Sequence, residues 1–357
     1  MPIFRSMLSG VRRQIVRIAA LYGVIVAGVL LADLVGVGEP ATVIDGRLHH
    51  STLGFRNLSP DYSYSLRERA AHLLRRRAVT RGPALNPVPN DGSEVRKNGR
   101  APTVTWVGHS TLLVQIDGLN VLTDPHWGER ASPLGFAGPR RLIPPGISFE
   151  DLPRIDAVVI SHDHYDHLDR DTVKRLARDH HPTFFVPLGI KAWLAKVGVD
   201  EVVELDWWQT AKLRGLTFVC TPAQHSSGRG VLDQNHRLWS SWVVLGATKR
   251  FFFAGDTGYY PGLLDIGRRF GPFDLAALPI GGYSDLDRHH PNHLNPEEAA
   301  RLLDDLPGAL MVPMHWGTFD FNREPFREPP DRLLREAVAR GIEARVAVLS
   351  PGQTIPW

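Results

Sequence analysis

At 357 residues, with 43% hydrophobic and 22% charged residues, the chain has the composition of a folded protein and not of a disordered one. Its net charge of +3 is small and its arginines are scattered, so we predict no nucleic-acid partner. Cys220 is the only cysteine, which excludes an intrachain disulfide and a thiolate zinc site, so any metal must be held by histidine and carboxylate side chains.

The N-terminus predicts a membrane anchor over residues 1–39. Residues 18–32 carry no charge, and the apolar stretch approaches the roughly 20 residues that span a bilayer if Asp33 lies near an interface. Arginines precede this stretch and acidic residues follow it, which places the rest of the chain on the non-cytoplasmic, periplasmic side. A cleaved signal peptide and a buried helix are the alternatives, but we find no convincing small-x-small cleavage site.

Residues 40–100 have few periodic apolar positions and end in a run of turn-forming residues at 82–92, so they are predicted to be a linker and N-terminal extension. Within this segment, only residues 66–77 have the composition of a helix.

Residues 101–357 are predicted to form a layered α/β domain, because short β-rich runs give way to alternating strands and helices. The predicted strands span residues 104–107, 112–116, 121–123, 157–161, 183–186, 217–220, 242–245, 251–254, 275–279 and 310–314. The predicted helices span residues 171–179, 190–197, 296–303 and 331–340.

A metal-ligand motif follows the strand at 157–161. Three imidazoles and a carboxylate crowd one turn: His162, His164, Asp166 and His167. Nitrogen and oxygen donors of this kind suit zinc. An isolated polar loop explains such crowding poorly.

Three further donors each follow an apolar strand: His225, Asp256 and His315. Because ligands gather at the carboxyl ends of strands in α/β sheets, these residues are expected to meet the first four. Seven donors exceed what one tetrahedral zinc accepts, and a shared carboxylate can hold two ions about 3.5–4 Å apart. The sequence therefore predicts a dinuclear site.

This constellation resembles the metallo-β-lactamase superfamily, which implies a four-layer αβ/βα sandwich. The resemblance implies that His162, His164 and His225 bind the first metal, that Asp166, His167 and His315 bind the second, and that Asp256 bridges them. It also implies that Asp124 orients a metal-bound histidine from outside the coordination sphere.

Further segments resemble the N-acyl-phosphatidylethanolamine-hydrolysing phospholipases D, over roughly residues 103–341. They include residues 106–110, 205–208, 222–225, 238–242, 255–259, 268–276, 296–299 and 315–319. The resemblance implies two Zn²⁺ ions per chain, a membrane phospholipid substrate, and attack on phosphorus by a metal-bridging hydroxide, which releases N-acylethanolamine and phosphatidate. Asp166 and Asp256 would then be catalytic, and His293 or His109 would contact substrate or donate a proton.

Two other functions stay open at this point. The same site could serve a lactonase or a phosphodiesterase of a small soluble ester. A non-enzymatic, membrane-tethered binding module is the other alternative; it predicts an incomplete ligand set, whereas no ligand is missing here. An apolar groove would favour the lipid substrate, with Trp207, Trp208, Trp239, Phe319 and Phe321 as candidate lining residues. Whether the chain forms a homodimer is also left open.

Overall fold

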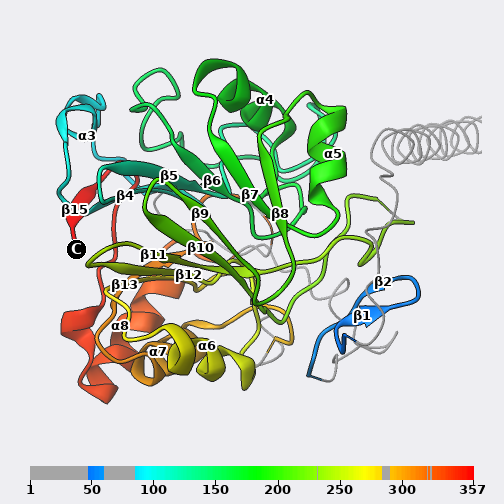
Figure 1. Ribbon diagram of the computed structural model, residues 1–357. Coiled ribbons are helices and arrows are strands. Elements are labelled where there is room, and N and C mark those ends of the chain that lie inside the picture. Colours follow the sequence, from blue (N-terminus) through cyan, green and yellow to red (C-terminus); the bar gives the residue numbers. More distant parts are fainter. Residues whose placement is uncertain (1–46, 60–84, 231, 284–289, 320, 322–323) are drawn as a thin grey trace, which may run out of the picture.

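Two β-sheets lie face to face between two layers of helices in the computed structural model (Figure 1). The structure describes residues 47–59, 85–230, 232–283, 290–319, 321 and 324–357. The order of layers is helix, sheet, sheet, helix, which confirms the predicted αβ/βα sandwich.

The first half of the domain, together with the last strand of the chain, builds a seven-stranded sheet in the order β15-β3-β4-β5-β6-β7-β8. From β5 onward neighbouring strands run parallel, whereas β15, β3, β4 and β5 pair antiparallel. Its strands are β3 (Thr103–Gly108), β4 (Thr111–Ile116), β5 (Leu119–Thr123), β6 (Ala157–Val159), β7 (Thr183–Pro187), β8 (Val202–Leu205) and β15 (Thr354–Pro356).

The second half builds a six-stranded sheet in the order β14-β13-β12-β11-β10-β9. Here β12, β13 and β14 are parallel and the other pairs are antiparallel. Its strands are β9 (Thr210–Leu213), β10 (Leu216–Thr221), β11 (Ser241–Leu245), β12 (Arg250–Phe253), β13 (Leu275–Pro279) and β14 (Leu310–Met314).

Helices cover the outer face of each sheet. α4 (Arg170–Asp179) and α5 (Ile190–Lys196) pack on the seven-stranded sheet, where Leu176 and Trp193 join the same apolar cluster as Phe184. α6 (Gly262–Phe270), α7 (Pro296–Asp305) and α8 (Glu328–Arg340) lie outside the other sheet. The other helices of the described residues are short: α3 (Ser93–Lys97) and the 3₁₀ turn η1 (Glu343–Arg345).

The inner faces of the two sheets form the main core. Phe185 of one sheet stacks on Phe218 of the other with ring centroids 3.9 Å apart, and Trp106 and Trp242 are fully buried in the same cluster. Since burying apolar area contributes about 25 cal/mol per Å², this rigid core holds the strand ends in fixed positions. Residues that follow those strands are therefore placed with little freedom.

The predicted strands and helices are present with small shifts at their ends. The strand expected over residues 157–161 ends at Val159. The amide of Ile160 still donates to the carbonyl of Phe185 in β7 at 3.0 Å, but the amide of Ser161 bonds to Asp124 Oδ1 at 2.6 Å. Sequence patterning missed the helices α3 and α6 and the short strands β8, β9 and β15.

Part of the segment expected to be a linker is packed on the sandwich. Residues 47–59, which we call the docking hairpin, contain β1 (His50–Ser51) and β2 (Gly54–Phe55), and Phe55 joins the main core. The expected anchor over residues 1–39 and the expected helix over residues 66–77 lie outside the described residues. In the described part of the chain, no helix has the length and apolar character needed to cross a membrane.

Candidate metal centre

The expected ligands meet at one edge of the sandwich. The loop 162–167 follows β6, and the later donors follow β10, β12 and β14. Each strand thus delivers its ligand just beyond its last residue, as the strand-end argument predicts.

Three imidazoles form one group of donors, which we call the histidine set: His162, His164 and His225. His162 Nε2 lies 2.8 Å from His164 Nδ1, which lies 3.2 Å from His225 Nε2. The three donor nitrogens therefore face a common point, as metal ligands do.

A second group, the carboxylate set, consists of Asp166, His167 and His315. Asp166 Oδ2 lies 3.1 Å from His167 Nε2 and 3.5 Å from His315 Nε2. This set carries an anionic ligand, whereas the histidine set has none of its own.

Asp256 stands between the two sets. Its Oδ2 lies 3.1 Å from His167 Nε2 and 3.0 Å from His315 Nε2, both in the carboxylate set. The same atom lies 3.8 Å from His225 Nε2 in the histidine set. Asp256 Oδ2 thus faces Nε2 atoms of both sets.

Outer hydrogen bonds orient the ligating rings. Asp124 Oδ2 accepts from His167 Nδ1 at 2.7 Å, which confirms the position expected for Asp124. The carbonyl of Asn292 accepts from His225 Nδ1 at 2.9 Å. With the proton on Nδ1, each ring presents the lone pair of Nε2 to the centre.

Ser161 completes this outer layer and was missed by sequence reasoning. Its hydroxyl donates to Asp124 Oδ2 at 2.5 Å, so its oxygen accepts from His162 Nδ1 at 2.9 Å. This fixes the tautomer of His162 and again leaves Nε2 free to bind. The feature of the sequence that could have identified Ser161 is its position directly before His162, the first ligand.

The backbone turns sharply where the site is built. His109, Asp124 and His315 have φ values of 52°, 34° and 60°, in the left-handed region that side chains rarely adopt. Each lies just after a strand, and such outliers persist where surrounding structure fixes them, typically at functional sites.

The buried electrostatics separate the two sets. Burial lowers the pKa of His225 to about 3, and burial with the neighbouring His167 holds the pKa of His162 well below its ordinary value. Burial also opposes charge on His167, but Asp256 and Asp166 outweigh it and raise its pKa well above the ordinary value. A negative potential of this kind attracts a cation.

The donor groups fit a metal. His167 Nε2, His315 Nε2 and Asp256 Oδ1 are buried and make no hydrogen bond within the described residues. Buried polar atoms are normally satisfied, and a coordinated cation would satisfy these. Histidine nitrogens and carboxylate oxygens are ligands of zinc and of related transition metals.

His109 and His293, the two residues expected to contact substrate or donate a proton, both lie beside the ligands. His109 Nε2 is 2.9 Å from Asp166 Oδ2, and burial, followed by His315, lowers the pKa of His109 to about 3. His293 Nδ1 lies 3.7 Å from Asp256 Oδ2, and its side chain is more exposed than those of the ligands His167, His225 and His315. Their catalytic roles stay predictions.

The candidate lining aromatics divide into two groups. Phe319 and Phe321 lie beside His109, with ring centroids 5.1 and 5.9 Å from it, and Phe321 is 38% exposed. Trp207 and Trp239 are instead buried in the main core. Trp208 is partly buried against the same core and packs against Phe270. Of the five candidates, the two phenylalanines are thus the ones shown beside the donor sets.

A buried ion-pair network supports the loop 162–167 from below. Arg237 Nη1 donates to Asp163 Oδ2 at 2.6 Å and to Asp233 Oδ2 at 2.8 Å. Arg229 Nη1 donates to the carbonyls of Asp163 and Leu168 at 2.7 and 2.9 Å, so one guanidinium ties the two ends of the loop. Removing one partner of such a buried pair typically costs about 3–5 kcal/mol.

Residues 119–316, more than half of the chain, match the family model described as the beta-lactamase superfamily domain. The chain belongs to this superfamily. It is a metal-dependent hydrolase of the metallo-β-lactamase fold, in agreement with the donor sets at its strand ends.

Two relatives place this superfamily member more narrowly. An uncharacterised protein of Mycobacterium tuberculosis is 45% identical over 311 residues, which cover 84% of this chain and 82% of that protein. The N-acyl-phosphatidylethanolamine-hydrolyzing phospholipase D 1 of Caenorhabditis elegans is 44% identical over 248 residues, which cover 66% of this chain and 70% of that protein. The resemblance to these phospholipases is confirmed.

Solved structures agree on the superfamily fold. A metallo hydrolase from the archaeon Ignicoccus hospitalis is 27% identical, with a TM-score of 0.55 over 72% of this chain and 98% of that one. An isothiocyanate hydrolase from Delia radicum gut bacteria has a TM-score of 0.56 at 24% identity, over 71% of this chain and 99% of that one, and shares the fold.

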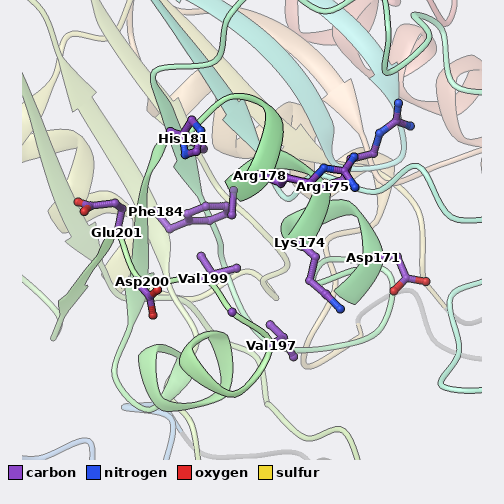
Figure 2. Close-up of a pocket in the computed structure, with 13 residues that line it drawn as sticks. Asp171, Lys174, Arg175, Arg178, His181, Phe184, Val197, Val199, Asp200 and Glu201 are labelled. Atoms are coloured by element: carbon purple, nitrogen blue, oxygen red, sulfur yellow. The ribbon is translucent and has the colours of Figure 1, made fainter.

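A separate surface hollow of about 770 Å³ lies beside α4. Figure 2 shows charged side chains around it, among them Lys174, Arg178 and Glu201, over Phe184 and Val199. It shares no residue with either donor set, and the residues that line it form no group of metal donors. The chemistry therefore belongs to the strand ends and not to this hollow.

Proposed function

We propose that the chain is a dinuclear zinc phosphodiesterase of the phospholipase D type, which hydrolyses N-acylphosphatidylethanolamine to N-acylethanolamine and phosphatidate. The observation that carries the substrate is the 44% identity with the C. elegans enzyme over 248 residues. A yeast protein named for the same activity is 34% identical over 257 residues, which cover 70% of this chain and 55% of that protein.

Two ions are supported by the grouping of the donors. His162, His164 and His225 would hold one ion and the carboxylate set the other, with Asp256 shared. When bound, such a pair of ions lowers the pKa of a water towards neutrality and neutralises charge on phosphoryl oxygens. Zinc is proposed because five of the seven donors are imidazoles, which are common ligands of zinc.

The chain's own side chains would orient the substrate around this centre. His293 is placed to contact a phosphoryl oxygen or the leaving oxygen, because it lies beside Asp256 and is partly exposed. His109 bonds to Asp166 and so holds that carboxylate in place. Phe319 and Phe321 offer an apolar surface for an acyl chain beside these polar groups.

A membrane partner is supported by the docking hairpin. Leu48, Leu53 and Leu58 are 74%, 77% and 47% exposed, which is unusual for three leucines in thirteen residues. The hairpin follows the segment predicted to be the anchor and lies against His225 through Asn57. We propose that the anchor and these leucines hold the centre at the periplasmic membrane surface.

The test is a vesicle assay with the full-length protein. Phosphatidylcholine vesicles that contain N-acylphosphatidylethanolamine are incubated with the zinc-loaded protein, and free N-acylethanolamine and phosphatidate are quantified by mass spectrometry. We expect both products in equal amounts. Turnover of a soluble phosphodiester or a lactone with no release of N-acylethanolamine would overturn the proposal and favour the alternative hydrolase.

A further inference from the structure

The docking hairpin reaches a metal ligand through one side chain. Asn57 Nδ2 donates to the carbonyl of His225 at 2.8 Å, and Asn57 Oδ1 accepts from the amide of His225 at 3.1 Å. The amide of Asn57 therefore holds both backbone polar groups of His225, in the manner of a neighbouring strand. Asn57 lies 168 positions from His225, in a segment that patterning predicted to be a linker.

The same amide is fixed from the side of the core. Trp239 Nε1 donates to Asn57 Oδ1 at 3.0 Å and to the carbonyl of Ala223 at 3.0 Å. Trp239 is 1% exposed and its carbonyl accepts from Trp207 Nε1 at 2.7 Å. Asn57 thus lies between a rigid part of the core and the backbone of a ligand.

A buried carboxylate fastens the other end of the docking hairpin. Asp206 Oδ1 lies 2.7 Å from His49 Nε2, Asp206 Oδ2 lies 3.0 Å from His50 Nε2, and Arg47 also bonds to Asp206. The ring of His49 stacks on Trp207 with centroids 4.3 Å apart. Since Arg47 already neutralises Asp206, this cluster serves as a clamp and is a poor site for a cation.

The docking hairpin fits closely against the loop that follows His225. The amide of Phe55 donates to the carbonyl of Asn235 at 2.8 Å. Gly54 has φ +132°, and a Cβ at this position would lie 2.1 Å from that carbonyl oxygen. The contact therefore requires glycine, and any larger residue would displace the docking hairpin.

We propose that the docking hairpin is part of the metal centre, and that Asn57 is a positioning residue that sets His225 for the ion held by the histidine set. This inference rests on the proposed dinuclear centre. Without Asn57, His225 keeps the bond from Nδ1 to Asn292 but loses the contacts that fix its main chain. Metal–nitrogen bonds tolerate only about 0.2 Å of error, so a loosened main chain weakens binding.

The test compares Asn57→Ala with a matched control, Asn90→Ala, in the full-length protein. Asn90 is also partly buried and bonds to Gly352, Thr354 and the amide of Gly92, outside both donor sets. Zinc affinity is measured by chelator competition, and the absorption spectrum of the Co²⁺-loaded protein reports ligand geometry. Unfolding of the metal-free protein in urea shows how much each variant loses in stability.

We expect Asn57→Ala to lower the affinity for one of the two zinc ions by roughly 10- to 100-fold and to alter the Co²⁺ spectrum. Asn57→Asp, which keeps the acceptor but loses the donor to His225, should lie between wild type and Asn57→Ala. Gly54→Ala should reproduce the loss of affinity, and Asn90→Ala should leave zinc affinity and the spectrum unchanged.

Two outcomes would contradict the account, and they differ. If wild type binds two ions and Asn57→Ala matches Asn90→Ala in affinity and spectrum, the inference about Asn57 is wrong and the proposed centre stands. If wild type itself does not bind two ions, the proposed dinuclear centre fails first and the inference fails with it.

Discussion

The histidine set and the carboxylate set sit side by side but are held by different forces. His162 and His225 are buried neutral imidazoles whose pKa values burial lowers, and no carboxylate belongs to their set alone. His167 and His315 face Asp166 and Asp256, which raise their pKa values although burial opposes this. The histidine set thus presents the lone pairs of neutral imidazoles to a metal, whereas the carboxylate set also presents negative charge.

This contrast indicates how each set depends on its surroundings. Neutral donors bind a cation through geometry, so the histidine set should be sensitive to contacts that place its rings, such as those from Ser161 and Asn57. Anionic donors add Coulombic attraction, so the carboxylate set should be sensitive to loss of charge. Asp256 links the sets, and its removal should affect both.

Asp256→Asn is expected to give the largest effect, since it removes the carboxylate charge that faces Nε2 atoms of both sets. We expect turnover to fall by roughly 10³-fold and zinc content to fall below two ions per chain. The measurement is product release from vesicles with metal analysis of the same sample. Asp265→Asn, on the exposed side of α6, is the control and should change neither. Full activity in Asp256→Asn would refute the shared-carboxylate arrangement.

His225→Ala and His315→Ala should each remove one ligand from one set. We expect each variant to keep one tightly held ion and to lose turnover by roughly 10²-fold. The two variants should differ in the Co²⁺ spectrum, because His315→Ala retains the histidine set and His225→Ala retains the carboxylate set. Metal titration checks this, and identical spectra with two ions retained would contradict the division into sets.

Asp124→Ala removes the acceptor that orients His167 and the one that receives the hydroxyl of Ser161. We expect zinc affinity to fall by roughly 10- to 100-fold, in both sets because Ser161 in turn orients His162. Chelator competition at two concentrations of chelator resolves the two ions. Loss confined to one ion would show that Ser161 orients His162 without help from Asp124.

Asp206→Asn should loosen the docking hairpin, and we expect it to have the smallest effect of these variants, a loss of stability. Burial alone would raise the pKa of Asp206, but bonds from His49 and the amide of Trp207 hold it below the ordinary value. Its contribution to stability is therefore complete above the ordinary pKa of about 3.9 and is lost as the pH falls through the lower folded value. We expect a loss of about 1–3 kcal/mol in unfolding free energy at pH 7.

The pH dependence of that variant is the check. Urea unfolding of the metal-free protein should show the difference from wild type at pH 7 and a smaller difference below about pH 4. A constant difference at both pH values would mean that Asp206 acts through packing and not through its charge.

The sequence predicted the donors because the rule that places them is local. Each of His225, Asp256 and His315 follows an apolar strand, and these strands, β10, β12 and β14, run in the same direction and end at the same edge of the sheet. The loop at 162–167 gave the strongest signal, because its ligands are close in sequence. Alternating strands and helices predicted a layered α/β domain, whereas the resemblance to the metallo-β-lactamase superfamily implied the four-layer sandwich.

The docking hairpin and its contacts could not be predicted in this way. Its strands have two residues each, too short to show a period, and its contacts join His49 to Asp206 and Asn57 to His225 over more than 150 positions. α6 was missed because its two glycines and adjoining proline weaken the helical pattern. Contacts between single polar side chains that are far apart in the chain leave no periodic pattern, so one sequence does not predict them.

The most direct test of the account is a zinc titration of the metal-free, full-length protein with lipid turnover followed in parallel. We predict that two equivalents of zinc bind and that release of N-acylethanolamine from vesicles rises to its maximum as the second equivalent is taken up. Maximal turnover at one equivalent, or two bound ions with no release of N-acylethanolamine, would contradict the assignment of a dinuclear phospholipase.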